Sequence, residues 1–157
     1  MKRRNESPLI FVLKGFIPYT NANLLLTYKP NAFFNELEKL SGYKRKTLQA
    51  AYYRARQQKL LTTDSVPRLT LEGKQRVQPF VAEYLGGNAK LMVIFDISEA
   101  QKSQRDKFRR FLQSLYFVQA QQSVWVTEYD HRDILREAII AFDLSDSVQV
   151  YEAALIS

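Results

Sequence analysis

The sequence predicts an α+β protein built from two domains of different kinds. Three observations lead to this prediction. Positive charge is concentrated in the first half, the one Gly-Gly pair at Gly86-Gly87 divides the chain, and helical apolar spacing before this pair gives way to a mixture of strands and helices after it. We therefore expect one domain over residues 1–87 and a second over residues 88–157.

The composition favours a globular protein and excludes several kinds of site. The chain has 157 residues, of which 46% are hydrophobic and 25% charged. It has no cysteine and one histidine, which excludes disulfides, thiolate zinc sites and thiol nucleophiles. No apolar run approaches the roughly 20 residues of a membrane span, so we expect a cytoplasmic protein without a membrane partner.

The charge distribution indicates a polyanionic partner for the first half. The formal net charge is +7 and the sequence pI is about 9.6. Residues 1–87 hold 15 Lys and Arg against 6 acids, a balance of +9, whereas residues 88–157 hold 8 against 10, a balance of −2. One domain therefore carries the excess charge, as expected of a nucleic-acid-binding module attached to a module with another role.

The start of the first half is predicted to be helical. Residues 8–15 form a short apolar helix that Gly15 ends, and residues 18–28 are ambiguous. After Pro30, with Asn31 as a plausible cap, a helix places four apolar residues on one face and ends at Ser41-Gly42: Phe33, Phe34, Leu37 and Leu40.

A basic helix over residues 44–59 follows almost at once. Leu48, Ala51, Tyr52 and Ala55 have the spacing of a buried stripe, so Lys46, Gln49, Ala50, Tyr53, Arg54 and Gln57 are expected to point outward. A small hairpin over residues 60–70 and a last helix over residues 71–85 complete the half. Two helices joined by a Gly-containing turn, followed by a hairpin, are typical of a winged helix-turn-helix. The alternative is a basic helix face that is merely solvated.

This arrangement makes double-stranded DNA the expected partner, because the second helix can enter a major groove while the hairpin reaches the neighbouring backbone. The candidates for phosphate contacts are Lys44, Arg45, Lys46, Arg56 and Arg68. The candidates for reading bases are Gln49, Tyr53 and Arg54.

The second half predicts the order βαββαβ, which is the ferredoxin-like arrangement. A strand over residues 91–97 precedes a Ser98/Gln101 capping box and a helix with its core stripe at Phe108, Phe111, Leu112 and Leu115. Short strands over residues 117–120 and 123–127, a helix capped by Asp130 and a strand over residues 148–155 follow. One face of such a sheet is uncovered, and Trp125 and Tyr151 near it favour a homodimer through this domain.

Two motifs in the second half resemble a known module. VIFDISEAQKSQRDKFRRFLQSLYFVQAQQSVWV is similar to the central module shared by PaaX-type transcriptional repressors and the small CRISPR-associated endonuclease of the adaptation complex, with Phe117-Val118-Gln119 and Gln122-Ser123-Val124-Trp125 as the matching segments. The likeness covers about residues 90–155 and implies a ferredoxin-like homodimer. GYKRKTLQAAYYRARQQKLL and PRLTLEGKQRV resemble the winged-helix region of PaaX-type repressors, so the order of modules implies a dimeric transcriptional repressor.

Asp96, at the end of the apolar strand, has three interpretations, one of which is a role at the dimer interface. The resemblance to the endonuclease implies that Asp96 binds a divalent metal such as Mg²⁺, with the second copy of a dimer supplying another carboxylate. The simpler interpretation is that Asp96 caps the next helix. No catalytic residue and no cofactor are expected under the regulator hypothesis, and His131 is expected at the surface. The alternatives are a metal-dependent endonuclease or spacer-acquisition subunit with an added winged helix, and a protein-interaction module.

Overall fold

The computed structural model describes residues 6–156 and divides the chain into two compact units, Met1–Phe80 and Val81–Ser157. The boundary falls at the end of a helix rather than after Gly87. Residues 83–85 belong with the second unit because the Leu85 N–H donates to the Glu128 carbonyl at 2.8 Å and the Asp130 N–H donates to the Glu83 carbonyl at 2.8 Å. In the described part of the chain, no helix has the length and apolar character needed to cross a membrane.

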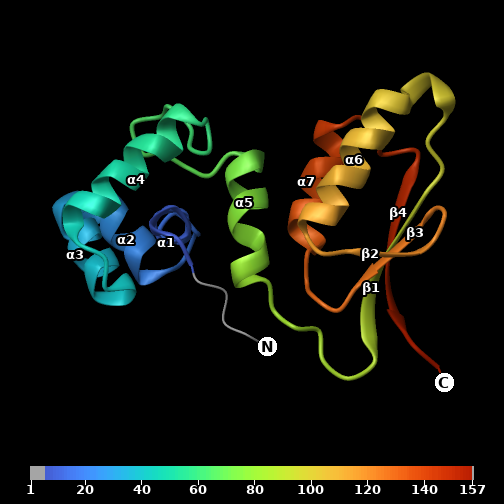
Figure 1. Cartoon of the computed structure of the whole chain (residues 1–157), viewed down its shortest axis with the longest axis horizontal. Coiled ribbons are helices and arrows are strands. Elements are labelled where there is room, and N and C mark those ends of the chain that lie inside the picture. The colour runs from blue at the N-terminus through green and yellow to red at the C-terminus, as the bar shows by residue number, and fades with distance from the viewer. Residues whose placement is uncertain (1–5, 157) are drawn as a thin grey trace. The chain divides into compact units, whose positions relative to one another are not determined.

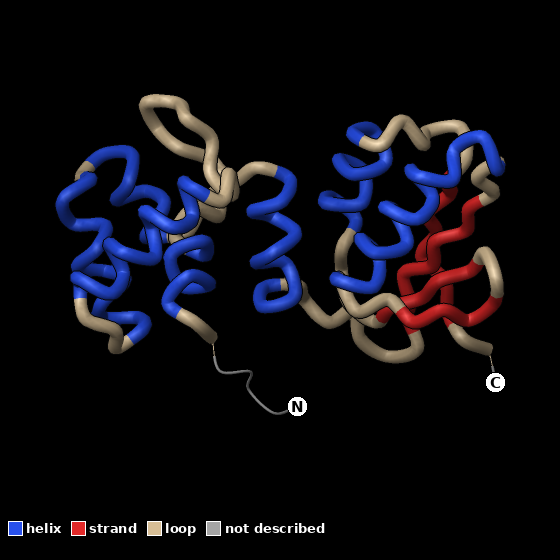
Figure 2. The backbone as a smooth tube through the Cα atoms, turned by 45° about the horizontal axis from the view of Figure 1, so that its top comes forward, coloured by secondary structure: helices blue, strands red, loops and turns tan. Residues whose placement is uncertain are grey.

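The first unit is a helical bundle followed by a loop and a further helix (Figures 1 and 2). Its helices are α1 (Pro8–Lys14), α2 (Asn21–Tyr28), α3 (Pro30–Ser41), α4 (Arg45–Gln57) and α5 (Leu71–Val81). The ambiguous segment is thus helical from Asn21, with the Thr20 hydroxyl accepting the Asn23 N–H. The expected cap at Asn31 is wrong, because α3 begins at Pro30, whose fixed φ suits the first helical position.

The core of this unit lies between α1, α3 and α4. Leu13, Phe33, Leu37 and Leu48 are each at most 1% exposed. Leu40, which the apolar pattern placed with this group, is 62% exposed instead. The predicted last helix is also too long, since α5 ends at Val81 and not at Leu85.

The loop between α4 and α5 has the pairing of a very small hairpin. Leu61 and Leu69 form one isolated antiparallel bridge, the Thr62 N–H donates to the Arg68 carbonyl at 2.8 Å, and the Thr70 N–H donates to the Leu60 carbonyl at 3.0 Å. Gly73, at the start of α5, is packed tightly against the end of this pairing: an added Cβ would lie 2.1 Å from the Leu60 carbonyl oxygen.

The second unit is a four-stranded antiparallel sheet with two helices on one face (Figures 1 and 2). Its elements in chain order are β1 (Ala89–Phe95), the 3₁₀ turn η1 (Glu99–Gln101), α6 (Lys102–Ser114), β2 (Val118–Gln121), β3 (Val124–Thr127), α7 (Arg132–Ala141) and β4 (Val148–Ala154). The strand order across the sheet is β2-β3-β1-β4, with β1 antiparallel to both β3 and β4. The whole chain is therefore an α+β protein.

The helices cover the sheet through the predicted stripes. Phe108, Phe111, Leu112 and Leu115 of the α6 region are 0–2% exposed, as expected from their spacing. The predicted capping box is wrong, because the Ser98 side chain makes no cap hydrogen bond and η1 precedes the α-helix.

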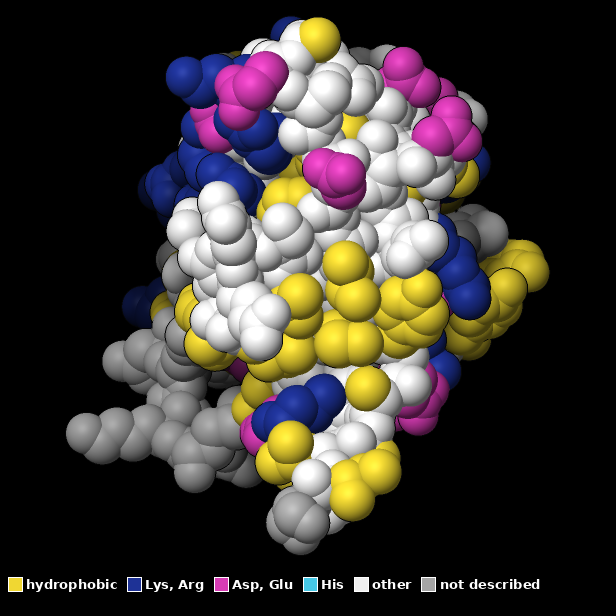
Figure 3. Space-filling view, turned by 90° about the vertical axis from the view of Figure 1, so that its right-hand side faces the viewer, with side chains coloured by type: hydrophobic (Ala, Val, Ile, Leu, Met, Phe, Trp, Pro, Cys, Tyr) yellow, Lys and Arg dark blue, Asp and Glu magenta, His cyan; other side chains and the backbone are white. Residues whose placement is uncertain are grey.

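The other face of the sheet is apolar and is not covered by any element of this unit (Figure 3). In the sheet register, Met92 is opposite Val126 and Tyr151, and Ile94 is opposite Val124. Trp125 does not belong to this face: it is opposite Val93, on the helix-covered side, and is 3% exposed. The expectation that placed Trp125 near the open face is therefore wrong, whereas Tyr151 does lie there and is 44% exposed.

Candidate nucleic-acid interface

The outer face of α4 is fixed by the way the helix begins and by its buried stripe. Gly42 adopts the left-handed conformation at φ 73° and ends α3, and the Glu38 carboxylate then accepts the Arg45 N–H at 2.6 Å, which satisfies one free amide at the start of α4. Leu48 and Ala55 are fully buried on the inner side. The residues on the opposite side of the helical wheel must therefore face away from the core.

The outward side of α4 carries cationic and hydrogen-bonding groups, as predicted. Lys46, Gln49, Arg54 and Gln57 are exposed, and the Tyr53 side chain is 65% exposed. Within residues 6–156, the side chains of Lys46, Gln49, Tyr53 and Arg54 have no hydrogen bond or ion pair to another residue. This surface of α4, which we define by these four residues and call the α4 outer face, offers donors that the protein itself does not use.

Tyr52 lies at the edge of the buried stripe. It is only partly buried, and its ring stacks on Phe16 with centroids 6.0 Å apart and meets Phe34 edge-on at 6.0 Å. Arg56 donates from Nη1 to the Tyr52 hydroxyl at 3.2 Å. Arg56 is exposed, but its guanidinium has this intramolecular partner.

Arg45 lies away from the outer face and is engaged with α3. Its Nη1 donates to the Asn35 side-chain oxygen at 2.6 Å, its Nη2 donates to the Asn31 carbonyl at 3.3 Å, and its guanidinium lies 5.8 Å from the centre of the Phe34 ring. Arg45 therefore holds the turn between α3 and α4 together. Lys44, the residue before the helix, is exposed.

Arg68 lies in the loop between α4 and α5 and is paired with an acid. Its Nη2 donates to the Asp64 carboxylate at 2.9 Å, and this hydrogen bond lowers the pKa of Asp64 from its ordinary value. Because both partners are exposed, the pair is worth little to stability and can open for a competing anion. Of the eight residues predicted to contact DNA, Arg45, Arg56 and Arg68 thus have partners within the first unit.

Asp96 follows β1 and is exposed. Its backbone N–H donates to the Ser147 carbonyl at 3.0 Å, but its carboxylate makes no hydrogen bond within residues 6–156, so the cap interpretation is wrong. No group of three His, Asp or Glu side chains able to hold a metal gathers in this part of the chain. Mg²⁺ usually takes one or two carboxylates together with water and phosphate oxygens, so Asp96 of one chain would supply one such ligand and leave the other positions to water, phosphate or a second copy.

His131 is buried, which contradicts the surface position expected for it. Its side chain is 2% exposed and lies between the rings of Phe117 and Tyr129, with centroids 5.6 and 6.4 Å away. Burial lowers the pKa of His131 to about 4, although its hydrogen bond to the Leu115 backbone and the charge of Asp130 act in the opposite direction. His131, Ile134, Leu135 and Ala138 have the spacing of one helical face, a signal that could have located His131 in the core.

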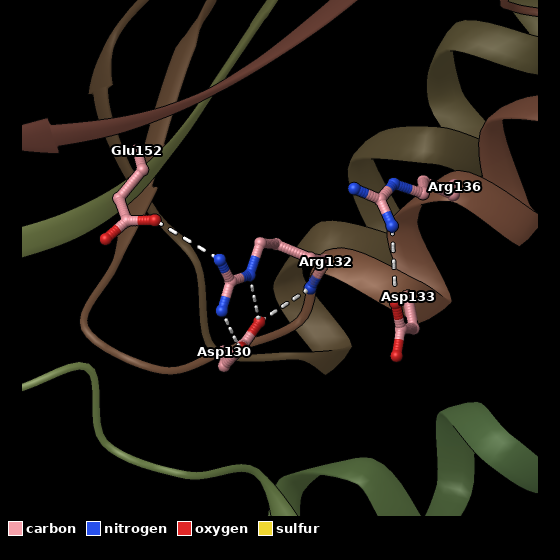
Figure 4. Close-up of polar contacts among 5 residues, drawn as sticks. All are labelled: Asp130, Arg132, Asp133, Arg136 and Glu152. Atoms are coloured by element: carbon pink, nitrogen blue, oxygen red, sulfur yellow. Dashed lines mark hydrogen bonds and ion pairs between the residues drawn. The ribbon is translucent and has the colours of Figure 1, made fainter.

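The start of α7 is fixed by an acid, although not as a regular cap. His131 occupies the cap position and makes no side-chain cap bond, while Asp130 accepts the Arg132 N–H at 3.1 Å. The Asp130 carboxylate also pairs with the Arg132 guanidinium, which reaches Glu152 of β4 at 3.2 Å (Figure 4). These contacts tie the helix start to an edge strand.

The comparison with known families concerns the second unit. Residues 91–157 match the family model described as the PaaX protein central Cas2-like domain. No curated protein matches the chain. The matched range contains the two spaced motifs, Phe117-Val118-Gln119 and Gln122-Ser123-Val124-Trp125, on which the resemblance was based. Over this range, which is less than half of the chain, the protein is therefore similar to the central Cas2-like domain of PaaX proteins.

Proposed function

We propose that this protein is a dimeric repressor of transcription of the PaaX type that binds double-stranded DNA through the α4 outer face. In this proposal, the first unit is a winged helix-turn-helix domain, with α3 and α4 as the two helices and the loop around Leu61 and Leu69 as the wing. The second unit is a ferredoxin-like domain that holds two copies together.

One observation carries the DNA-binding part of the proposal. Lys46, Gln49, Tyr53 and Arg54 project from one side of a helix whose other side is anchored in the core, and they have no partner within residues 6–156. Gln can bind adenine and Arg can bind guanine through two hydrogen bonds each in the major groove, while Lys46 is suited to a phosphate. Because residues 1–87 carry a balance of +9, long-range attraction favours the duplex as well.

The open face of the sheet supports the dimer. The order β2-β3-β1-β4 with two helices on one side is the order expected of a ferredoxin-like domain. Met92, Ile94, Val124 and Val126 present a contiguous apolar surface, with Val118 66% exposed at its edge. A self-complementary apolar patch suits a two-fold interface, and two copies would place two α4 helices on two half-sites about 34 Å apart or a multiple of that spacing.

Selection of bound sequences from random duplexes tests the proposal. We expect enrichment of a two-fold symmetric motif, because each copy reads one half-site. The variant Lys46→Gln/Arg54→Gln should lose that enrichment, whereas the control Lys29→Gln/Lys39→Gln removes the same charge from exposed positions of the first unit outside α4 and should retain it. Duplex binding that depends on neither pair, or selection without enrichment, would contradict the proposal.

A second candidate function rests on Asp96. The domain match is Cas2-like, and the Asp96 carboxylate is exposed and unbonded within the described chain, so it is open to a cation shared between two copies. The alternative is a metal-dependent endonuclease or spacer-acquisition subunit. Incubation of labelled DNA and RNA with Mg²⁺ or Mn²⁺ tests it: cleavage by the wild-type protein that is lost in Asp96→Ala would favour the enzyme, and intact substrates would favour the regulator.

A further inference from the structure

Helix α6 concentrates the positive charge of the second unit. Residues 88–157 contain 8 Lys and Arg, and five of these lie in α6: Lys102, Arg105, Lys107, Arg109 and Arg110. The helix contains one acid, Asp106, although residues 88–157 as a whole have a balance of −2. Most acids of this unit therefore lie outside α6. A surface whose only role is to be solvated usually has positive and negative side chains interspersed.

Two of the five cations are occupied within the unit. Arg105 donates to the Glu99 carboxylate at 2.8 Å, and this hydrogen bond lowers the pKa of Glu99. The Lys107 ammonium lies 4.4 Å from the centre of the Phe142 ring, on the side of α6 toward the end of α7.

We call the other three cations the α6 cation set. Glu99, which is already paired with Arg105, also feels the charges of Lys102 and Arg109 but forms no ion pair with them. Lys102, Arg109 and Arg110 form no ion pair within residues 6–156, and Lys102 and Arg110 are exposed. Arg109 is partly buried, with its guanidinium 6.0 Å from the centre of the Phe95 ring and its buried Nε atom without an acceptor. The Arg109 guanidinium thus forms no hydrogen bond within residues 6–156, and only its terminal Nη atoms, not the buried Nε, could reach a phosphate.

The geometry of the set suits a strand of a duplex. At about 100° per residue, Lys102 and Arg109 lie within roughly 20° of each other on the helix, and Arg110 lies about 100° further round. Lys102 and Arg109 are separated by about 10 Å along the axis of α6, which equals the rise of about three base pairs along a duplex axis.

Helix stability does not account for the set. The first turn of α6 contains no acid and begins with Lys102, although the helix dipole makes a cation unfavourable there. Lys102 therefore lies where it destabilises the isolated helix. Glu99 of η1 offsets part of this effect, and a phosphate bound nearby would offset more of it.

The chemistry of the exposed face favours DNA over a protein partner. Between residues 102 and 114 every apolar side chain of α6 is buried, and the exposed side chains are charged or are the polar residues Ser103 and Gln113. Protein interfaces gain their affinity from buried aromatic and aliphatic anchors, which this face lacks. Phosphate contacts, in contrast, are made by Lys, Arg, Ser and Gln side chains.

We propose that the α6 cation set is a second DNA-contacting surface, which binds the phosphates of duplex DNA without reading its sequence. This inference rests on the proposed function for the identity of the ligand, but it involves a different unit and different residues from the α4 outer face. Asp106, between Lys102 and Arg110 on the helix, is the acid that opposes this binding.

Two variants with opposite expected effects test the inference. Lys102→Gln/Arg110→Gln removes two exposed cations that form no hydrogen bond or ion pair within residues 6–156, so the fold should be unaffected. It should weaken binding to a selected site and to a random duplex by the same factor. Raising the salt from about 50 to 200 mM should weaken DNA binding of the variant less than that of the wild-type protein. The difference should be about 12-fold for each protomer whose α6 contacts DNA, because two contacts at a slope of about 0.9 each are lost. Asp106→Asn should strengthen both bindings.

Matched controls separate a local contact from a change of net charge. Lys107→Gln/Arg136→Gln also removes one Lys and one Arg, from the other flank of α6 and from α7, where Arg136 pairs with Asp133. Asp133→Asn, at a 96% exposed acid of α7, is the control for Asp106→Asn. An unchanged salt response in Lys102→Gln/Arg110→Gln, or equal effects in test and control variants, would overturn the inference.

The same titrations distinguish this inference from the proposed function. If Lys46→Gln/Arg54→Gln abolishes site preference while the α6 variant alters only affinity, both stand. If only the α4 variant changes the affinity for duplex DNA, the α6 inference alone is overturned. If only the α6 variant changes it, the proposed role of α4 alone is overturned. Binding of polyglutamate that depends on the α6 set, without any effect on duplex, would assign the set to an acidic protein and overturn it.

Discussion

Protonation of His131 is predicted to destabilise the second unit as the pH falls. The ring is 2% exposed, and burial lowers its pKa to about 4 in the folded protein, against 6.5 for the ordinary side chain. Below pH 6.5 the unfolded chain therefore binds a proton that the folded chain does not. Stability should be fully present above about pH 6.5 and should be lost progressively down to about pH 4.

The magnitude follows from the two pKa values. A difference of about 2.5 pKa units corresponds to about 3 kcal/mol in the limit of low pH, and the share lost between pH 8 and pH 5 is about 2 kcal/mol. The sequence contains one histidine and no cysteine, so no other side chain has an ordinary pKa in this interval. Asp130, whose pKa is lowered by its hydrogen bond with Arg132, loses its contribution only at lower pH.

The chain offers a local probe for this measurement. Trp125 is the only tryptophan and is buried in the second unit, so its fluorescence during urea unfolding reports on this unit. We expect the free energy of unfolding of the wild-type protein to fall by about 2 kcal/mol from pH 8 to pH 5. His131→Gln, which removes the titrating group, should be nearly independent of pH over that range. Parallel pH profiles for the two proteins would refute the reasoning.

Three further predictions follow from packing. Phe108→Ala, at a fully buried position, should reduce the free energy of unfolding seen by Trp125 fluorescence by about 3–5 kcal/mol, and a loss below 1 kcal/mol would place Phe108 outside the core. Gly73→Ala brings a Cβ within 2.1 Å of the Leu60 carbonyl oxygen and should reduce the free energy of unfolding of the first unit by about 1–3 kcal/mol. The thermal midpoint followed by circular dichroism should fall accordingly, and an unchanged midpoint would show that this contact relaxes freely. Ile94→Lys, on the open sheet face, should convert a dimer to a folded monomer in light scattering, and an unchanged mass would exclude this face as the interface.

The elements that the sequence predicts well are those whose apolar spacing has a single period. In α4, Leu48, Ala51 and Ala55 are buried where a period of 3.6 residues places them, and in α6 the whole predicted stripe is buried. The exposure of Lys46 and Arg54 follows from the same periodicity. The side of a helix that faces solvent can thus be predicted whenever its core side is unambiguous.

The ends of elements were less predictable, because contacts distant in sequence decide them. Tyr84 and Leu85 continue the apolar pattern of α5, yet the chain leaves the helix after Val81 and pairs with the segment around Tyr129. The Asn31 and Ser98 caps failed for a related reason: a proline and a 3₁₀ turn, respectively, provided another way to start the helix. Local propensity alone does not rank such alternatives.

The sequence predicted which residues of the candidate site face outward, but not which of them lack a hydrogen-bond partner within the protein. Arg45, Arg56 and Arg68 have the charge that DNA binding requires, but each has a partner whose position depends on the turn between α3 and α4 or on the loop after α4. Sequence periodicity gives the direction of a side chain and not its hydrogen-bond partner. The distinction between used and unused cations therefore needed three-dimensional structure.

The alternation of side chains between the two faces of the sheet explains both the error at Trp125 and the apolar face opposite the helices. Strand β1 is apolar at consecutive positions, so its sequence does not show which residues face the helices. The register resolves this: Val93 is opposite Trp125, on the covered side, and Met92 is opposite Val126, on the open side. A strand with both faces apolar needs two covers, and α6 and α7 provide one. Under the proposed function the second cover is the same face of a second copy, and the test at Ile94 therefore bears on the dimer and not on the fold.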